Sequence, residues 1–253
     1  MTSPVYYPLE SRFRAIVVGA SSGLGAALVR QLTNQCYRVA AVARREANLA
    51  ALRDNVGKDV VLPYVHDVME FEQTPMLFDQ ITRDLGGLDL IIYCAAVQPP
   101  VALHEYSFEK DEAMVNTNFL GAVAWLNQAA TRFERARGGQ IVGISSIAGD
   151  RGRVGSPTYN ASKAGLNTYL EALRNRLSRY GVTVTTIKPG FVDTELLKNA
   201  PKTFWVISPE EAAAQTLTAI RRRRQVAYVP SRWQFVGLAV RSVPSFIFRR
   251  LSF

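Results

Sequence analysis

The stretch SSIAGDRGRVGSPTYNASK, residues 145–163, is the centre from which the rest of the chain can be interpreted. It follows residues 140–144 (QIVGI), an apolar run typical of a buried strand, and passes through a polar, glycine-rich loop into a predicted helix. Tyr159 and Lys163 are four residues apart and therefore share one face of that helix. Ser146 lies at the end of the strand, so a hydroxyl, a phenol and an ammonium group are predicted to converge.

These three side chains are suited to proton transfer. A free phenol has a pKa of about 10 and is a poor acid or base near neutrality. A neighbouring cation such as Lys163 lowers that pKa, and Ser146 can hold a carbonyl or hydroxyl oxygen against the phenol of Tyr159. The set suits proton transfer coupled to hydride transfer at a carbon that bears oxygen. Because the chain has ten tyrosines, the tyrosine–lysine spacing alone is a weak signal.

A glycine-rich turn lies near the start of the chain, between a predicted strand at residues 13–18 and a predicted helix at residues 26–34. Glycines let the backbone approach a pyrophosphate, and a helix N-terminus offers it free N–H groups and a positive dipole end. A tight turn without any ligand is the alternative. The phosphate-binding interpretation gives these contact residues for a dinucleotide: Gly19, Ser21, Ser22, Gly23, Leu24 and Gly25.

Two arginines indicate which dinucleotide would bind. Arg44 and Arg45 end a predicted strand, about 20 residues past the glycines, where an acidic residue would bind the ribose 2′-hydroxyl of NAD. An arginine can instead bind a 2′-phosphate through two hydrogen bonds, which favours NADP(H). The alternative is a solvated start of the next helix, but cations are mildly unfavourable at a helix N-terminus.

The rest of the chain alternates between strands and helices. Further strands are predicted at residues 38–43, 59–64, 88–94, 140–145, 182–188 and 226–229, and further helices at 46–56, 71–84, 108–136, 157–180 and 208–223. Repeated units of this kind predict an α/β fold: a single doubly wound, Rossmann-type domain with a seven-stranded parallel sheet and helices on both faces. Ligands of such sheets bind beyond the carboxyl ends of the strands. Further candidate cofactor-binding residues at those ends are Asp67, Val68, Ala95, Pro189, Gly190, Val192 and Thr194.

The charge distribution and the cysteines narrow the classes of protein. The net charge is +9, but eight of the 30 basic residues lie beyond Glu211, and the other 22 nearly balance the 21 acidic residues. Residues 1–211 are therefore nearly neutral. This argues against a nucleic-acid-binding protein, which should carry a basic face on its fold. Two cysteines form no disulfide framework, and neither a metal-ligand spacing, a signal peptide nor an apolar run long enough to span a membrane is present, which predicts a cytoplasmic protein without a metal.

The chain resembles the short-chain dehydrogenase/reductase family over roughly residues 13–230. The resemblance rests on the glycine turn, Asp67, Asn118, Ser146, Tyr159, Lys163 and Pro189-Gly190. It implies that Tyr159 is the general acid/base, that Lys163 lowers its pKa and binds the nicotinamide ribose, and that Ser146 holds the substrate oxygen. It also implies that Asn118 supports a proton relay through water to Lys163, that Thr194 contacts the nicotinamide end and that Asp67 contacts adenine.

The chain departs from the family pattern at two places. Val18 replaces the usual threonine before the glycine turn, and residues 93–96 (YCAA) replace the usual Asn-Asn-Ala-Gly after the fourth strand. The first of those asparagines braces the central strands by hydrogen bonds, so this brace is predicted to be lost. Asn116 could compete with Asn118 for its role, but only Asn118 has the matching glycine, Gly121, three residues later.

The C-terminal segment, residues 231–253, is separated here from the catalytic domain at residues 1–230. It mixes aromatic and aliphatic residues with arginines, and Pro244 breaks it into two predicted short helices. Such helices can lie in a bilayer interface with arginines toward anionic headgroups. Alternatively, their apolar side covers the substrate pocket or a partner subunit.

Together these observations predict an NADPH-dependent enzyme that interconverts a carbonyl and a secondary alcohol. The aromatic and apolar loops at residues 97–107 and 191–207 suggest an apolar or lipid-like substrate. A catalytically silent NADPH sensor or scaffold is the alternative. Family members commonly pair through the helices at 108–136 and 157–180, so a homodimer or homotetramer is expected, with apolar surface from Val123, Trp125, Leu126, Leu166, Tyr169, Leu170 and Leu173.

Overall fold

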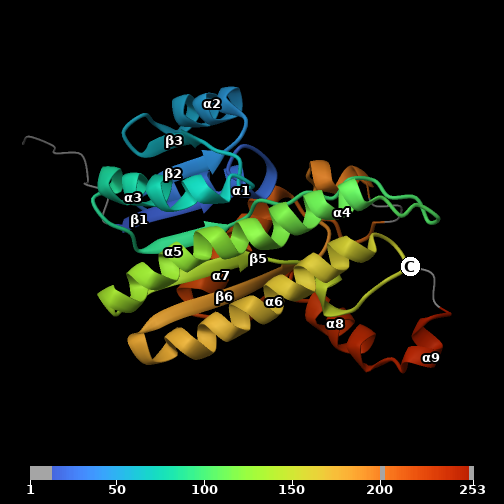
Figure 1. Cartoon of the computed structure of the whole chain (residues 1–253). Helices are drawn as coiled ribbons and strands as arrows, with labels where there is room; N and C mark the ends of the chain where they lie inside the picture. Colours follow the sequence, from blue (N-terminus) through green and yellow to red (C-terminus); the bar gives the residue numbers. More distant parts are fainter. Residues whose placement is uncertain (1–12, 200–202, 251–253) are drawn as a thin grey trace, which may run out of the picture.

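The computed structural model describes residues 13–199 and 203–250. Within them, seven parallel strands form one sheet in the order β3-β2-β1-β4-β5-β6-β7 (Figure 1). The strand order reverses between the hydrogen-bonded neighbours β1 and β4, so the sheet is doubly wound, as predicted. The strands are β1 (Phe13–Val18), β2 (Tyr37–Ala43), β3 (Val61–Val65), β4 (Leu90–Tyr93), β5 (Gly139–Ile144), β6 (Val182–Pro189) and β7 (Val226–Val229).

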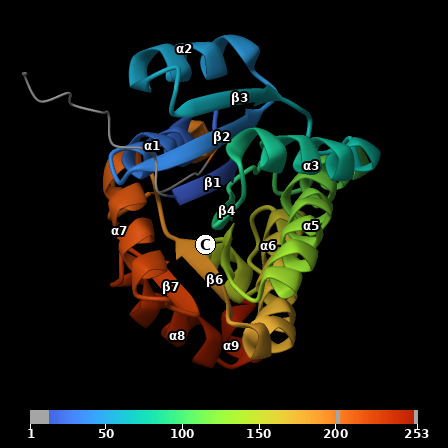
Figure 2. The ribbon, with the colours of Figure 1, turned by 90° about the vertical axis from the view of Figure 1, so that its left-hand side faces the viewer.

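Helices cover both faces of the sheet (Figure 2). One face is covered by α1, α2 and α7, and the other by α3, α5 and α6. Their bounds are α1 (Gly23–Thr33), α2 (Glu46–Val56), α3 (Thr74–Leu85), α4 (Phe108–Val115), α5 (Gly121–Ala136), α6 (Pro157–Leu177) and α7 (Pro209–Arg221).

The central strands are apolar on both sides because both sides are covered. In β1, Ala15 and Val17 pack into the core beneath α1 and α7, whereas Ile16 and Val18 pack into the core beneath α3, α5 and α6. All four side chains are fully buried. Such a continuous apolar run is what a parallel strand between two helical layers requires.

The helix predicted over residues 108–136 is interrupted. α4 ends at Val115, a π-helical turn spans Asn116–Leu120, and α5 begins at Gly121. π-helical turns occur mostly as single insertions in α-helices, often at functional sites. This one contains Asn118, a predicted site residue.

Other boundaries move by a few residues for identifiable reasons. β4 begins at Leu90 rather than at residue 88, because the side chain of Asp89 accepts a hydrogen bond from the backbone N–H of Arg14 (2.8 Å). α1 begins at Gly23, so Gly23 and Gly25, the last two glycines of the turn, lie in the first turn of this helix. α7 begins after Ser208, whose hydroxyl caps the helix by accepting a hydrogen bond from the N–H of Glu211 (3.1 Å).

The apolar residues proposed as an oligomer surface on α5 and α6 are mostly core residues. Trp125, Leu126, Leu166 and Leu170 are fully buried within the single chain, and Leu173 is nearly so. Only Val123 and Tyr169 are half-buried. The argument that these helices carry excess apolar surface is therefore wrong, because most of these side chains pack in the core beneath the sheet.

The C-terminal segment forms α8 (Trp233–Ser242) and α9 (Ser245–Phe248), separated at Pro244 as predicted. α8 contacts β7 and the loop that follows Ser146. Its inward side chains are Trp233, Val236 and Val240, and its outward side chains Phe235 and Leu238 are 76% and 57% exposed. Within the described ranges, no helix combines the length and apolar character needed to cross a bilayer.

Candidate active site

A large cavity of about 1610 Å³ opens at the carboxyl ends of the strands. The glycine turn forms one part of its wall, the ends of β4, β5 and β6 form the floor, and α8 closes the far side. This is the position at which doubly wound sheets bind their ligands. Of the predicted site residues, all line this cavity except Asp67 and Asn118.

Ser146, Tyr159 and Lys163 lie together on the wall of this cavity. The Nζ atom of Lys163 is 5.8 Å from the centre of the Tyr159 ring and donates a hydrogen bond to the carbonyl of Ile144 (3.0 Å). A hydrogen bond joins the side chains of Ser146 and Tyr159. The predicted convergence of hydroxyl, phenol and ammonium is therefore present in the structure.

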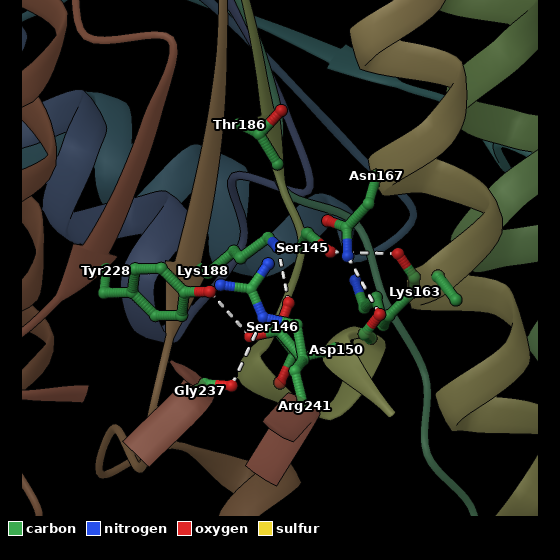
Figure 3. A network of polar contacts seen from close by, with 12 residues as sticks. Ser145, Ser146, Asp150, Lys163, Asn167, Thr186, Lys188, Tyr228, Gly237 and Arg241 are labelled. Carbon is green, nitrogen blue, oxygen red and sulfur yellow. Dashed lines mark hydrogen bonds and ion pairs between the residues drawn. The ribbon is translucent and has the colours of Figure 1, made fainter. Parts of the chain in front are cut away.

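Hydrogen bonds hold α6 against the loop after β5, and this fixes Tyr159 and Lys163 relative to Ser146 (Figure 3). The hydroxyl of Ser145 donates to the carbonyl of Lys163 (3.1 Å), and the amide of Asn167 donates to the carbonyl of Gly149 (3.1 Å). Gly149 is required for this approach, since a Cβ there would lie 2.7 Å from the backbone of Lys163.

The pKa values of the buried pair depart from the prediction. Burial raises the pKa of Tyr159, and a hydrogen bond from Ser146 and the charge of Arg153 lower it only in part. Burial also lowers the pKa of Lys163 to about 8. The expectation that Lys163 lowers the pKa of Tyr159 is not met here, because removal from water outweighs the nearby charges and the charge that does lower this pKa belongs to Arg153.

Asn118 does not face the cavity but holds part of its wall in place. Its side-chain carbonyl accepts a hydrogen bond from the N–H of Val97 (2.8 Å), and its amide donates to the carbonyl of Val97 (3.0 Å) and to the hydroxyl of Ser162 (3.2 Å). The side chain is fully buried. It thereby joins the π-helical turn to α6 and to the segment after β4.

Tyr93 stands where the family pattern has its first bracing asparagine, and it ties β4 to the helical layer beside the sheet. Its phenol donates a hydrogen bond to the carbonyl of Thr117 (2.5 Å), so β4 is tied to the π-helical turn. Gly121 makes room for this phenol, because a Cβ at Gly121 would lie 2.5 Å from the phenol oxygen. The loss of the asparagine's hydrogen bonds between the central strands stays a prediction, because the Tyr93 bond joins a strand to a helical turn. The pairing of a tyrosine with a later glycine is the signal that could have indicated the Tyr93 bond.

The glycine turn has the shape that a dinucleotide cradle requires. Gly19 has a φ of +91°, and a Cβ there would lie 2.5 Å from the backbone of Ala95. A Cβ at Gly25 would lie 2.0 Å from the carbonyl oxygen of Gly19. Only glycine fits either position, and the N-terminus of α1 is left open beside the cavity.

Arg45 and Arg44 lie at the mouth of the cavity, beside this turn. Arg45 donates to the hydroxyls of Ser21 (3.1 Å) and Ser22 (2.5 Å) and pairs with Glu195 (3.3 Å). Arg44 pairs with Asp67 (3.4 Å), whose other oxygen accepts from the N–H of Met69. Two guanidinium groups and two hydroxyls thus gather at the mouth of the cavity beside the glycine turn.

The opposite end of the cavity is apolar, and it is formed by the loop after β6 and by the C-terminal segment, which the sequence analysis gave as a possible cover of the substrate pocket. Trp233 is buried and stacks with Phe191 and Phe204, with ring centres 5.4 and 5.0 Å apart. A Cβ at Gly190 would lie 2.1 Å from the Trp233 ring, so this glycine lets α8 approach β6. Trp233 lies 29 positions beyond Phe204 and 42 beyond Phe191, and no local spacing connects it to them.

A buried charge network attaches α8 to the loop after Ser146 (Figure 3). Asp150 accepts from the ammonium of Lys188 (2.5 Å) and from the phenol of Tyr228 (2.7 Å). Gly237 of α8 passes directly over this carboxylate, where a Cβ would lie 2.7 Å from it. In addition, Arg151 donates to the carbonyls of Val240 (2.8 Å) and Val243 at the end of α8.

The comparisons with known proteins agree with this geometry. A model of the short chain dehydrogenase family matches residues 14–204. An uncharacterized oxidoreductase of Myxococcus xanthus is 39% identical over 184 residues, covering 72% of this chain and 73% of the relative. A ketoacyl reductase, HetN, of a Nostoc species is 30% identical over 219 residues, covering 82% and 75%. An uncharacterized oxidoreductase of Mycobacterium tuberculosis is 28% identical over 225 residues, covering 87% and 89%.

The chain therefore belongs to the short-chain dehydrogenase/reductase family and is an oxidoreductase of that type. Members of the family use a nicotinamide dinucleotide, act on small molecules and often form oligomers. In the part of the chain that the structure describes, no group of histidine, cysteine and carboxylate side chains is arranged to hold a metal ion.

Proposed function

We propose that the protein is an NADPH-dependent carbonyl reductase or alcohol dehydrogenase that interconverts a ketone and a secondary alcohol. One observation carries this proposal. Ser146, Tyr159 and Lys163 face the same cavity as the glycine turn, so a substrate oxygen and a dinucleotide can occupy it together. A catalytically silent NADPH sensor or scaffold would not need this buried set, and turnover of any carbonyl compound would exclude it.

The roles of the side chains follow from their chemistry. The hydroxyl of Ser146 holds the substrate oxygen, and Tyr159 donates its phenolic proton to that oxygen in reduction and takes a proton back in oxidation. The ammonium of Lys163 lies on the same cavity wall and would bind the nicotinamide ribose. Asn118 acts as a positioning residue through its hydrogen bonds to Val97 and Ser162. The reduced nicotinamide supplies the hydride when it is bound.

The cofactor that this site favours is NADP(H). Arg45 is already hydrogen-bonded to Ser21 and Ser22, so a 2′-phosphate placed there would meet a guanidinium and two hydroxyls together. Arg44 lies at the same mouth. In contrast, no carboxylate stands directly after β2 to accept hydrogen bonds from the ribose of NAD.

An apolar, lipid-like ketone suits the substrate end of the cavity. This end is formed by apolar side chains from the loops at 97–101 and 191–204 and from α8: Pro99, Val101, Phe191, Leu196, Phe204, Trp233, Val236 and Val240. Such walls favour an alkyl or acyl chain. A panel of carbonyl compounds of increasing chain length, followed by the loss of the NADPH absorbance band, tests the proposal, and activity should rise with chain length.

A homodimer or homotetramer is also proposed, on a smaller surface than the sequence suggested. Phe119 and Tyr169 stack edge to face across the π-helical turn and α6, with ring centres 6.4 Å apart, and half-buried Val123 lies on neighbouring α5. Leu120 is 39% exposed on the same turn. An apolar outer face of this kind fits a second copy of the chain, and light scattering would measure the assembly.

The exposed face of α8 and α9 is proposed to attach a cytoplasmic protein reversibly to anionic membranes. Phe235, Leu238, Phe246 and Ile247 are exposed there, and no acidic residue lies between Ala212 and the last residue. Arg232, Arg241, Arg249 and Arg250 provide the positive charge. The arginines at residues 221–224 do not belong to this surface, because they lie at the opposite end of β7 from α8. An apolar substrate could then enter from the membrane side.

A further inference from the structure

One cation in the substrate end of the cavity has no counter-charge. Arg153 lines the cavity in the loop between Ser146 and Tyr159. Its Nη2 atom reaches only the side-chain oxygen of Asn160, at 3.4 Å, and its Nε atom is buried without a hydrogen-bond partner. Within residues 13–199 and 203–250, no carboxylate lies within 4.0 Å of this guanidinium.

The other basic side chains that line the cavity all have acceptors of their own. Lys110 pairs with Glu105, and Lys163 donates to a main-chain carbonyl. Arg151 is used by the end of α8, and Arg44 and Arg45 pair with Asp67 and Glu195. Arg153 differs from these, because its one acceptor is a neutral amide at the limit of hydrogen-bond length.

The loop holds Arg153 in this place. Asn160 is buried on α6, and its amide donates to the carbonyls of Gly155 (3.0 Å) and Arg153 (3.3 Å). Ser156, which ends the loop, has a left-handed backbone with a φ of +48°. The loop backbone is thus held at the arginine itself and over the residues that follow it, and the guanidinium of Arg153 lines the cavity.

The neighbourhood of the reacting atoms defines where an anion would lie. The charge of Arg153 is close enough to Tyr159 to lower the pKa of the phenol. A substrate oxygen held by Ser146 and Tyr159 would therefore be near this guanidinium. Half-buried guanidinium donors without acceptors are unfavourable, and a carboxylate can accept two of their hydrogen bonds at once.

We propose that Arg153 binds a carboxylate of the substrate, close to the carbonyl that is reduced, so that the substrate is an oxo acid with an apolar chain. This inference rests on the proposed function and narrows its substrate class. In this arrangement Arg153 determines specificity for acids, because it binds the carboxylate of the substrate. Ser146 and Tyr159 bind the oxygen of the carbonyl, and the apolar wall of the cavity contacts the alkyl chain.

A binding experiment that needs no turnover tests this directly. Octanoate and its uncharged analogue octanamide are titrated calorimetrically into the full-length protein saturated with NADP⁺. We expect octanoate to bind about tenfold or more tightly than octanamide, since a hydrogen bond to a charged group contributes roughly 1.5–3 kcal/mol. Arg153→Met should abolish the difference, whereas the exposed Arg132→Met on α5 should keep it. Equal binding of the two probes to the wild type, or a difference that survives Arg153→Met, would overturn the proposal.

A kinetic comparison separates anion binding from an effect on Tyr159. With 3-hydroxyoctanoate and its methyl ester as alcohol substrates, Arg153→Met should raise KM for the acid about tenfold or more and change KM for the ester little. Because the charge of Arg153 also lowers the pKa of Tyr159, the pH profile should shift equally with both substrates. An equal change in KM for the acid and the ester would contradict the proposal. If neither alcohol is oxidised but octanoate binding still depends on Arg153, the proposed reaction fails and the anion site stands.

Discussion

The phenol of Tyr93 lies 2.5 Å from the carbonyl oxygen of Thr117 and joins the central strand β4 to the π-helical turn that carries Asn118. The bond is buried, and its donor is fully enclosed. It explains why Gly121 follows the turn, since any larger residue would strike the phenol. At the position where the family pattern has an asparagine, a tyrosine thus ties the central strand β4 to the helical layer beside it.

Tyr93→Phe should destabilise the protein, because the carbonyl of Thr117 would then be buried without its hydrogen bond. The expected loss in the free energy of unfolding is about 1–3 kcal/mol, measured by urea denaturation. Tyr106→Phe is the matched control, since Tyr106 is 92% exposed, and it should change little. Equal stability of Tyr93→Phe and the wild type would show that the brace is not needed.

Arg45→Ala should weaken NADPH binding much more than NADH binding. The guanidinium joins Ser21 and Ser22 at the proposed 2′-phosphate position, and a charged hydrogen bond of about 1.5–3 kcal/mol corresponds to tenfold or more in Kd. Arg44→Asp should shift the preference further toward NADH. Fluorescence titration with both cofactors measures this, and equal affinity of the wild type for the two would refute the assignment.

Lys163 gives stability a characteristic pH dependence. Its pKa is about 8 in the folded protein, against 10.5 for an exposed lysine. Below pH 8 the buried side chain is charged in the folded state, and there its burial lowers the free energy of unfolding most. The unfolded state binds more protons between those values, and stability must rise with pH there. The free energy of unfolding of the wild type should gain about 3 kcal/mol relative to Lys163→Met across this range. Parallel curves for the two proteins, from denaturation at several pH values, would rule this out.

The outer face of α8 should mediate membrane attachment without affecting the pocket. Each arginine near an anionic surface contributes about 1 kcal/mol, so the wild type should sediment with anionic vesicles at low salt and dissociate as salt is added. The double variant Phe235→Ser, Leu238→Ser should lose sedimentation but keep NADPH binding, because both side chains point away from the cavity.

The control for this experiment is a pair of equally exposed apolar residues elsewhere, Val65→Ser and Met76→Ser, which should leave sedimentation unchanged. If the wild type never sediments with such vesicles at low salt, the membrane proposal is refuted. The same holds if the double variant changes only the oligomeric state, since the face would then bind a second copy. In the first case α8 would serve only as the wall of the pocket, and in the second it would also form a subunit interface.

The sequence predicts those parts of the site whose residues lie close together along the chain. The glycine turn before α1 and the convergence of Tyr159 and Lys163 could be predicted, because each depends on a strand, a turn and a helix that follow one another in the sequence. The strands could be recognised for the same reason, because residues such as Ile16 and Val17 must be apolar on both faces.

The remaining features depend on contacts between distant segments. Trp233 packs over Gly190, and Asp150 pairs with Lys188 beneath Gly237. Nothing in the local sequence around any of these residues indicates its partner. The direction of the Tyr159 pKa was also predicted wrongly, because burial, which outweighs the nearby charges, is a property of the whole fold.

The central claim is that Tyr159 transfers the proton in an NADPH-dependent reaction, and Tyr159→Phe tests it most directly. Two quantities are measured for this variant: the rate at which it turns over each carbonyl substrate with NADPH, and its Kd for NADPH. The account predicts that turnover of every carbonyl substrate is abolished while NADPH binding stays nearly unchanged, because only the phenolic proton is lost. A variant that binds NADPH and retains a tenth or more of the wild-type rate would contradict it.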